Sequence, residues 1–180
     1  MPQAAAKIRL SAKLLQPAEA KAGSWTFVVL PRAVSAKLPA RGMATVEGAL
    51  NGVAFRAVFE PDGQKSHWLK VDGKLGKAAG AVVGDVVTLE FSTAPLEPTV
   101  PADLKKALAA APKARAVWAD ITVLARQDWV HWVVSAKQAE TRARRVEGAC
   151  DMLAKGKRRV CCFDRTGFYS KSFSAPEAAL

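Results

Sequence analysis

The sequence lacks the features that mark membrane and secreted proteins. Its 180 residues contain no unbroken run of about 18 apolar residues, so we expect no transmembrane helix. Lys7, Arg9 and Lys13 interrupt the apolar residues at the start of the chain. A signal peptide needs an unbroken apolar centre, so we expect this segment to be retained.

Cysteine is scarce and confined to the end of the chain, at Cys150, Cys161 and Cys162. An odd, clustered set makes a poor disulfide framework and favours a reducing cytosol. Cys161 and Cys162 are adjacent, whereas paired zinc ligands stand about two to four residues apart. Nearby Arg158, Arg159 and Arg165 would lower the pKa of a thiol and make it reactive. The alternative is that these cysteines are small buried hydrophobic residues.

Motifs for catalysis are also missing. The two histidines, His67 and His131, lie on opposite sides of the expected domain boundary. The glycines at positions 76, 80 and 84 lack the Gly-Lys-Ser/Thr ending of a phosphate loop. No local spacing pairs two carboxylates for acid–base chemistry. We therefore predict no catalytic residue, no metal ligand and no cofactor, while an enzyme without a recognisable motif remains open.

What the chain does have is positive charge, with a net charge of +11. Residues 137–159 alone hold 8 basic and 3 acidic residues. Such a surface suits an acidic partner, a small anionic ligand, nucleic acid or an anionic membrane. It also suits a solvated face that keeps the protein in solution.

The first half of the sequence predicts strands. Alternating or β-rich patterns cover residues 8–14, 25–30, 43–50, 53–59, 66–71 and 86–92. Asn51-Gly52 joins two of these runs and predicts a type I′ hairpin turn. Six short strands with short connections would close most easily into a barrel. We therefore expect an α+β protein with a closed six-stranded antiparallel β-barrel followed by a C-terminal helical segment.

Three prolines, Pro95, Pro98 and Pro101, indicate a stiff linker and place the domain boundary near residue 97. The predicted domains are thus residues 1–97 and 98–180. Helices are expected at residues 102–111 and 114–124, and the longest at 127–155, where Trp129 and Trp132 begin an apolar stripe. Residues 174–180 are expected to be loose.

One face of the predicted long helix is polar and is the main candidate for ligand binding. Because a helix brings residues three and four apart together, Lys137, Thr141 and Arg144 share a side, with Arg142 and Arg145 beside them. Arginine and lysine are the residues that hold anions. No aromatic residues are interleaved with them, so a stacking platform for single-stranded nucleic acid is not evident.

Both halves of the chain resemble known families. In the first half, the resemblance rests on Leu30-Pro31, Asn51-Gly52 and residues 38–41, 53–56, 74–80 and 84–87. They resemble a small barrel domain of unknown function that usually precedes the YdeI/OmpD-associated (OmdA, "bacteriocin-protection") family. In the second half, residues 100–104, Trp132, Ala136-Lys137 and residues 140–146 resemble the OmdA module itself. The resemblance implies a bacterial protein with a barrel and a helical appendage, named for stress and envelope protection, and implies no reaction.

Three functional hypotheses follow. The first is a non-catalytic binding module in which Lys137, Thr141, Arg142, Arg144 and Arg145 contact an anionic ligand. The second is nucleic-acid binding through the basic residues 137–159, which predicts affinity that falls steeply with salt. The third is redox or enzymatic chemistry at Cys161 or Cys162.

Overall fold

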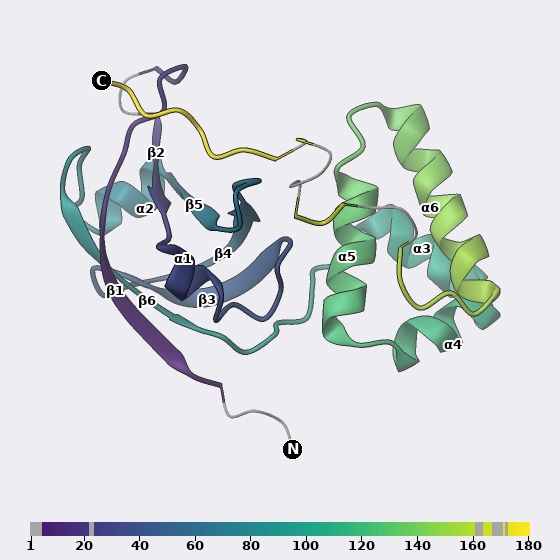
Figure 1. Ribbon diagram of the computed structural model, residues 1–180. Helices are drawn as coiled ribbons and strands as arrows, with labels where there is room; N and C mark the ends of the chain where they lie inside the picture. The colour runs from purple at the N-terminus through teal and green to yellow at the C-terminus, as the bar shows by residue number, and fades with distance from the viewer. Residues whose placement is uncertain (1–4, 22–23, 161–163, 167–170, 172) are drawn as a thin grey trace. The chain divides into compact units, whose positions relative to one another are not determined.

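The computed structural model describes residues 5–21, 24–160, 164–166, 171 and 173–180. The chain divides into two compact units (Figure 1). Residues 1–95 together with 164–180 form one, called here the sheet unit. Residues 96–163 form the other, called the helical unit.

Six strands build the described part of the sheet unit, as the sequence predicts. They are β1 (Lys7–Lys13), β2 (Trp25–Val29), β3 (Ala44–Leu50), β4 (Val53–Pro61), β5 (His67–Asp72) and β6 (Val86–Ser92), with short helices α1 (Arg32–Ser35) and α2 (Gly73–Ala78). All neighbours pair antiparallel, in the order β1-β6-β3-β4-β5-β2. Alternate residues of each strand point to the inner face, where Val46, Leu69 and Leu89 are fully buried.

The expected closed barrel is wrong, because the sheet is open between its end strands β1 and β2. Beyond the end of β1, a single bridge joins Leu15 to Phe27, with two backbone hydrogen bonds of 2.8 Å. Pro17 follows on one side of this bridge and Pro31 follows β2 on the other. Proline has no N–H to donate, so Pro17 stops the ladder on its side of the bridge, and Pro31 limits how far it could extend beyond β2 on the other.

The end of the chain returns to this opening. The amide of Ala18 donates to the carbonyl of Glu177 at 2.8 Å, and the amide of Ala179 donates to the carbonyl of Gln16 at 2.7 Å. Pro17 and Ala178 thereby form an antiparallel bridge. The expectation that residues 174–180 are loose is therefore wrong for residues 177–179, which pair with the segment that follows β1.

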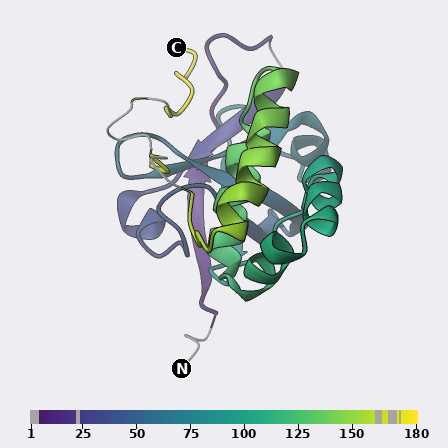
Figure 2. The same cartoon turned by 90° about the vertical axis from the view of Figure 1, so that its right-hand side faces the viewer.

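The helical unit contains α3 (Ala102–Ala110), α4 (Pro112–Asp120), α5 (Val123–Val134) and α6 (Ala139–Ala154). Figure 2 looks onto α6, which contacts the other three helices. The single long helix predicted for residues 127–155 is wrong, because the chain turns between α5 and α6. Folding back lets Trp129 and Val133 share one buried cluster with Leu153, whereas one continuous helix would leave that stripe exposed.

Candidate functional site

The polar face predicted from the sequence lies on α6 and just before it, and most of its cations already have partners. Arg142 makes a two-pronged pair with Asp103 of α3, at 2.7 and 3.1 Å. The Arg142 hydrogen bond is the main cause that lowers the pKa of the Asp103 carboxyl. Arg144 pairs with Glu140 one turn earlier at 2.6 Å.

Arg145 binds oxygen atoms at the end of α5 and, among the described residues, no carboxylate. It donates to the carbonyl oxygen of Trp132 at 2.7 Å and to Ser135 Oγ at 3.0 Å, and its guanidinium lies over the Trp132 ring, 5.4 Å from the centroid. Those acceptors stand at the C-terminal end of α5, where helix carbonyls lack partners within the helix. Arg145 therefore caps α5 and fixes the turn into α6.

The remaining two predicted residues are less engaged. Lys137 is exposed and Thr141 is half-buried. Among the described residues, neither side chain makes a hydrogen bond or ion pair. The structure thus brings the five predicted residues to neighbouring positions, with Lys137 and Thr141 available to a ligand. The assignment of this face as a binding site stays a prediction.

Three further arginines, two after α6 and one in α5, also have partners within the helical unit. Arg158 donates to the carboxylate of Asp120 at 2.5 Å and to the carbonyl of the same residue at 2.9 Å, at the end of α4. Arg159 pairs with Asp128 at 3.0 Å. Arg126 donates to the carbonyls of Trp118 and Ile121 and pairs with Glu97. The sequence shows the charge of these arginines but not that Arg158 and Arg126 cap the end of α4, nor that Arg159 pairs with a side chain inside α5.

A groove crosses the helical unit between α3 and α6. Its volume is about 640 Å³, and alanines form much of its wall. The charged residues that line it are Asp103, Arg142, Glu147 and Asp151, so carboxylates outnumber cations there. Cys150 also lines it, and burial raises the pKa of this thiol, which opposes reactivity at neutral pH.

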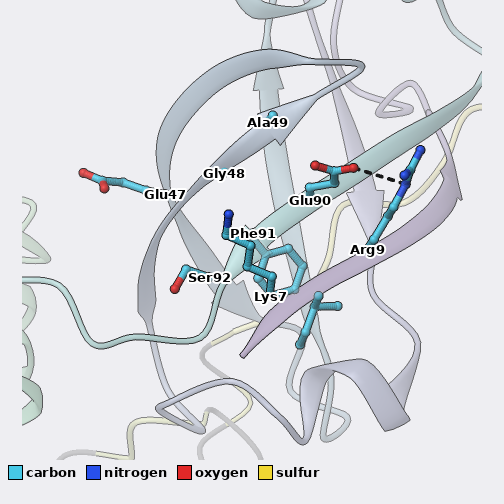
Figure 3. A pocket seen from close by; sticks show the side chains of 9 residues that line it. Lys7, Arg9, Glu47, Gly48, Ala49, Glu90, Phe91 and Ser92 are labelled. Atoms are coloured by element: carbon cyan, nitrogen blue, oxygen red, sulfur yellow. Dashed lines mark ion pairs between the residues drawn. The ribbon is translucent and has the colours of Figure 1, made fainter. Parts of the chain in front are cut away.

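A second hollow lies on the sheet where β1, β6 and β3 meet (Figure 3). Its volume is about 410 Å³. Glycine is required at Gly48 because a Cβ there would lie 2.0 Å from the carbonyl oxygen of Glu90. Figure 3 shows Arg9 and Glu90 pointing toward each other, 3.1 Å apart, while Glu47 points away. With Lys7 completing the set, the charges of this hollow cancel.

A third hollow, called here the His67 pocket, opens between α1 and the start of β5. Its volume is about 350 Å³. The residues that line it are Ser35, Ala36, Arg41, Pro61, Lys65, Ser66, His67 and Thr166. Arg41 and Lys65 are exposed, whereas the polar side chains of Ser35, Ser66 and His67 are buried. The pocket therefore combines a cationic rim with a floor of buried hydroxyl and imidazole groups.

His67 is the centre of that floor and is only 3 % exposed. Its Nε2 lies 2.7 Å from the carbonyl oxygen of Gly42, and its Nδ1 lies 2.6 Å from Ser35 Oγ. A carbonyl oxygen only accepts, so Nε2 carries the hydrogen, and Nδ1 of the neutral ring accepts from the Ser35 hydroxyl. Burial is the main cause that lowers the pKa of His67 below 6.5.

The loop before β5 positions Lys65 at the rim of the pocket. Asp62 Oδ1 accepts hydrogen bonds from the amides of Gln64 and Ser66, at 2.7 and 2.8 Å. Between them Lys65 adopts a left-handed backbone with φ of 71°, which a side chain other than glycine takes at a cost of about 1–3 kcal/mol. Ser66 Oγ donates to the carbonyl of Leu30 at 2.6 Å and ties the loop to the residue that follows β2.

Sequence reasoning missed this pocket because its residues come from four separate stretches of chain. The one usable signal was Arg41, which ends the 38–41 segment that carries the family resemblance. The other two predicted site residues, Cys161 and Cys162, lie outside the described residues. Within the described ranges, no three His, Cys, Asp or Glu side chains gather as a metal site would need.

An open antiparallel sheet with a cation-rimmed pocket, joined to a four-helix segment, defines a two-part α+β protein. Two family models match these parts. Residues 11–91 match DUF1905, a domain of unknown function, and residues 97–156 match OmdA, described as "Bacteriocin-protection, YdeI or OmpD-Associated". A DUF1905 match thus precedes an OmdA match in the chain, which is the order that the resemblance predicted. No curated protein matches the sequence.

None of the helices in the described part of the chain has the length and apolar composition needed to cross a bilayer.

Proposed function

We propose that the protein is a non-catalytic binding module that holds a small anion in the His67 pocket. One observation carries this proposal. Among the described residues, the lining of the pocket includes Arg41, Lys65 and four further polar side chains but no carboxylate. The hollow on the sheet and the groove on the helices each include two or more carboxylates.

The chemistry of the lining suits an oxyanion. Arginine offers a planar fork of donors and lysine a compact charge, and hydrogen bonds to such charged groups are about twice as strong as neutral ones. The strained backbone at Lys65 supports a functional role for that residue, because such conformations concentrate at binding sites.

A binding role fits the pocket better than a nucleophilic serine does. In Ser–His catalysis the second ring nitrogen is held by a carboxylate, which stabilises the imidazolium as it forms. Here that nitrogen donates to the carbonyl of Gly42, and Ser35 itself is only 5 % exposed. Both features favour a polar floor for a ligand over an attacking hydroxyl.

The proposal is tested by titrating the full chain with sulfate and with glycerol phosphate in a calorimeter. Arg41→Gln should weaken both ligands by about tenfold, which corresponds to about 1.4 kcal/mol, because it removes a rim donor. Arg32→Gln is the matched control, since Arg32 is an exposed arginine on α1 that does not line the pocket. Absence of binding by the unaltered chain, or equal losses in the two variants, would contradict the proposal.

The wider setting is also a proposal. The description of the OmdA model supports a link to stress or envelope protection, and the few cysteines support a cytosolic location. Anion contacts from Lys137, Thr141, Arg142, Arg144 and Arg145 would add a second binding face. Nucleic-acid binding through residues 137–159 and thiol chemistry at Cys161 or Cys162 stay as alternative predictions.

A further inference from the structure

We propose that the His67 pocket binds a tetrahedral oxyanion together with one proton, which His67 takes up and which turns the Ser35 hydroxyl toward the ligand. This inference rests on the proposed function, because it describes how the same pocket recognises its anion. It requires the geometry of only three groups: the ring of His67, Ser35 Oγ and the carbonyl of Gly42.

While the His67 ring is neutral, the hydrogens of His67 and Ser35 are both used within the floor of the pocket. The Nε2–H of the neutral ring points to Gly42, and the hydroxyl hydrogen of Ser35 points to Nδ1 across 2.6 Å. Ser35 Oγ therefore presents only lone pairs to the pocket. Lone pairs repel an oxyanion, so the neutral floor opposes the attraction of the Arg41 and Lys65 rim.

Protonation reverses this arrangement. In the imidazolium form both ring nitrogens donate, so Nδ1–H must point to Ser35 Oγ and the serine hydrogen must rotate away from the ring. Ser35 lines the pocket, and its released O–H becomes a donor for the ligand. The ring adds one positive charge beneath the anion. A proton from solvent is therefore bound together with the oxyanion, and no covalent bond to the ligand forms or breaks.

The charged groups around the ring set the pH at which this happens. Asp62, in the loop before β5, raises the pKa of His67, but burial lowers it more. Arg41 and Lys65 at the rim add positive charge. From the C-terminal segment, the backbone of Arg165 lies against Gly42, and Asp164 accepts hydrogen bonds from Thr166. Without a ligand the neutral ring is favoured at neutral pH, and a bound dianion shifts the balance toward the imidazolium.

Sulfate binding and proton uptake by His67 are thermodynamically linked, so each must strengthen the other by the same factor. The coupling can therefore be measured from either side. Sulfate is the appropriate probe, since it does not itself titrate between about pH 5 and pH 8, the range in which histidine does. We expect the sulfate affinity to rise as the pH falls, by up to about tenfold per pH unit. Calorimetry in buffers of different ionisation enthalpy should show uptake approaching one proton.

Nitrogen NMR of the two histidines identifies the group that takes up the proton without any substitution. Sulfate at about pH 7 should move the ring nitrogens of His67 toward the imidazolium pattern. His131, in the helical unit, is an internal control and should not change. The variant His67→Gln places an amide N–H where Nε2–H lies and cannot titrate, so its sulfate affinity should not depend on pH.

The outcomes separate the two proposals. If the chain binds no sulfate at any pH, the proposed function fails. If it binds sulfate without proton uptake and with unchanged His67 resonances, the coupling is wrong while the anion site stands. Proton uptake that persists in His67→Gln would assign the proton to another group and also overturn the coupling.

Discussion

At the scale of single residues, the two histidines share one property that the sequence does not reveal. Both are removed from solvent to a large degree, and burial lowers the pKa of each. For His131, burial together with the positive charge of Arg145 lowers the pKa from 6.5 to about 4. The neutral form of this ring therefore belongs to the folded helical unit.

This depressed pKa predicts acid sensitivity. A histidine with a lowered pKa stabilises the fold above its unfolded pKa of 6.5 and loses that contribution as the pH falls through about 4. The loss should approach about 3 kcal/mol at 1.36 kcal/mol per pH unit. Urea unfolding followed by far-ultraviolet circular dichroism, at about pH 7 and about pH 4, measures it.

The control for that prediction is His131→Gln, which keeps a polar side chain of similar reach but removes the titration. Its free energy of unfolding should fall less than that of the unaltered chain between the two pH values. An equal fall would show that carboxylates elsewhere dominate acid unfolding.

The sequence indicated which charged residues lie near one another on a helix, but it did not indicate which side chains they contact. Lys137 and Arg142 were both assigned to a ligand face, yet Arg142 pairs with Asp103, 39 positions away. A helical pattern shows which residues share a face, but not which face another helix will approach. The same limit hid the His67 pocket, whose floor joins Ser35 to a ring 32 positions further along.

At the scale of elements, local signals located most strands and helices. The Asn51-Gly52 turn is confirmed, with φ of 48° and 83°, and Asn51 also accepts from the amide of Thr88 at 2.8 Å. Closure of the sheet was predicted wrongly because it depends on whether two distant edges can pair. Pro17 and Pro31 limit that pairing, a fact visible in the sequence only once the register is known.

The turn between α5 and α6 yields a second prediction. Arg145→Met keeps a long apolar stem over Trp132 but removes the donors to the Trp132 carbonyl and to Ser135. Because the part-buried Trp132 carbonyl loses a charged donor and keeps only the Ser135 hydroxyl, we expect the helical unit to lose up to about 1.5–3 kcal/mol of stability. Arg144→Met should cost only about 0.3–0.5 kcal/mol, since its pair with Glu140 is exposed. Urea unfolding of both variants compares them, and equal losses would remove the capping role.

At the scale of the whole chain, the sheet unit is assembled from two separate pieces of sequence. Residues 164–180 belong to it although the helical unit lies between them and residue 95. This return was not predicted, because residues 157–180 have no clear hydrophobic period. Its pairing depends on backbone hydrogen bonds near Pro17, which side-chain patterns do not encode.

The pairing predicts the effect of shortening the chain at residue 173. The amide of Ala18 should lose its hydrogen-exchange protection, because its acceptor is the carbonyl of Glu177. The amide of Leu15, which donates to Phe27, is the internal control and should stay protected. Unchanged exchange at Ala18 would show that residues 177–179 do not pair there in solution.

Because the sheet unit takes residues from both sides of the helical unit, the last part of the sheet unit is synthesised after the helical unit. A ribosome makes residues 96–163 before residues 164–180, and the helical unit is built from helices, whose backbone hydrogen bonds are local and form quickly. That unit can therefore reach its native state while the sheet unit still lacks its final segment. Until residues 177–179 are synthesised, the backbone groups of residues 16–18 stay open to other strands, including those of neighbouring nascent chains. The delay makes this edge the place where misassembly during synthesis would begin.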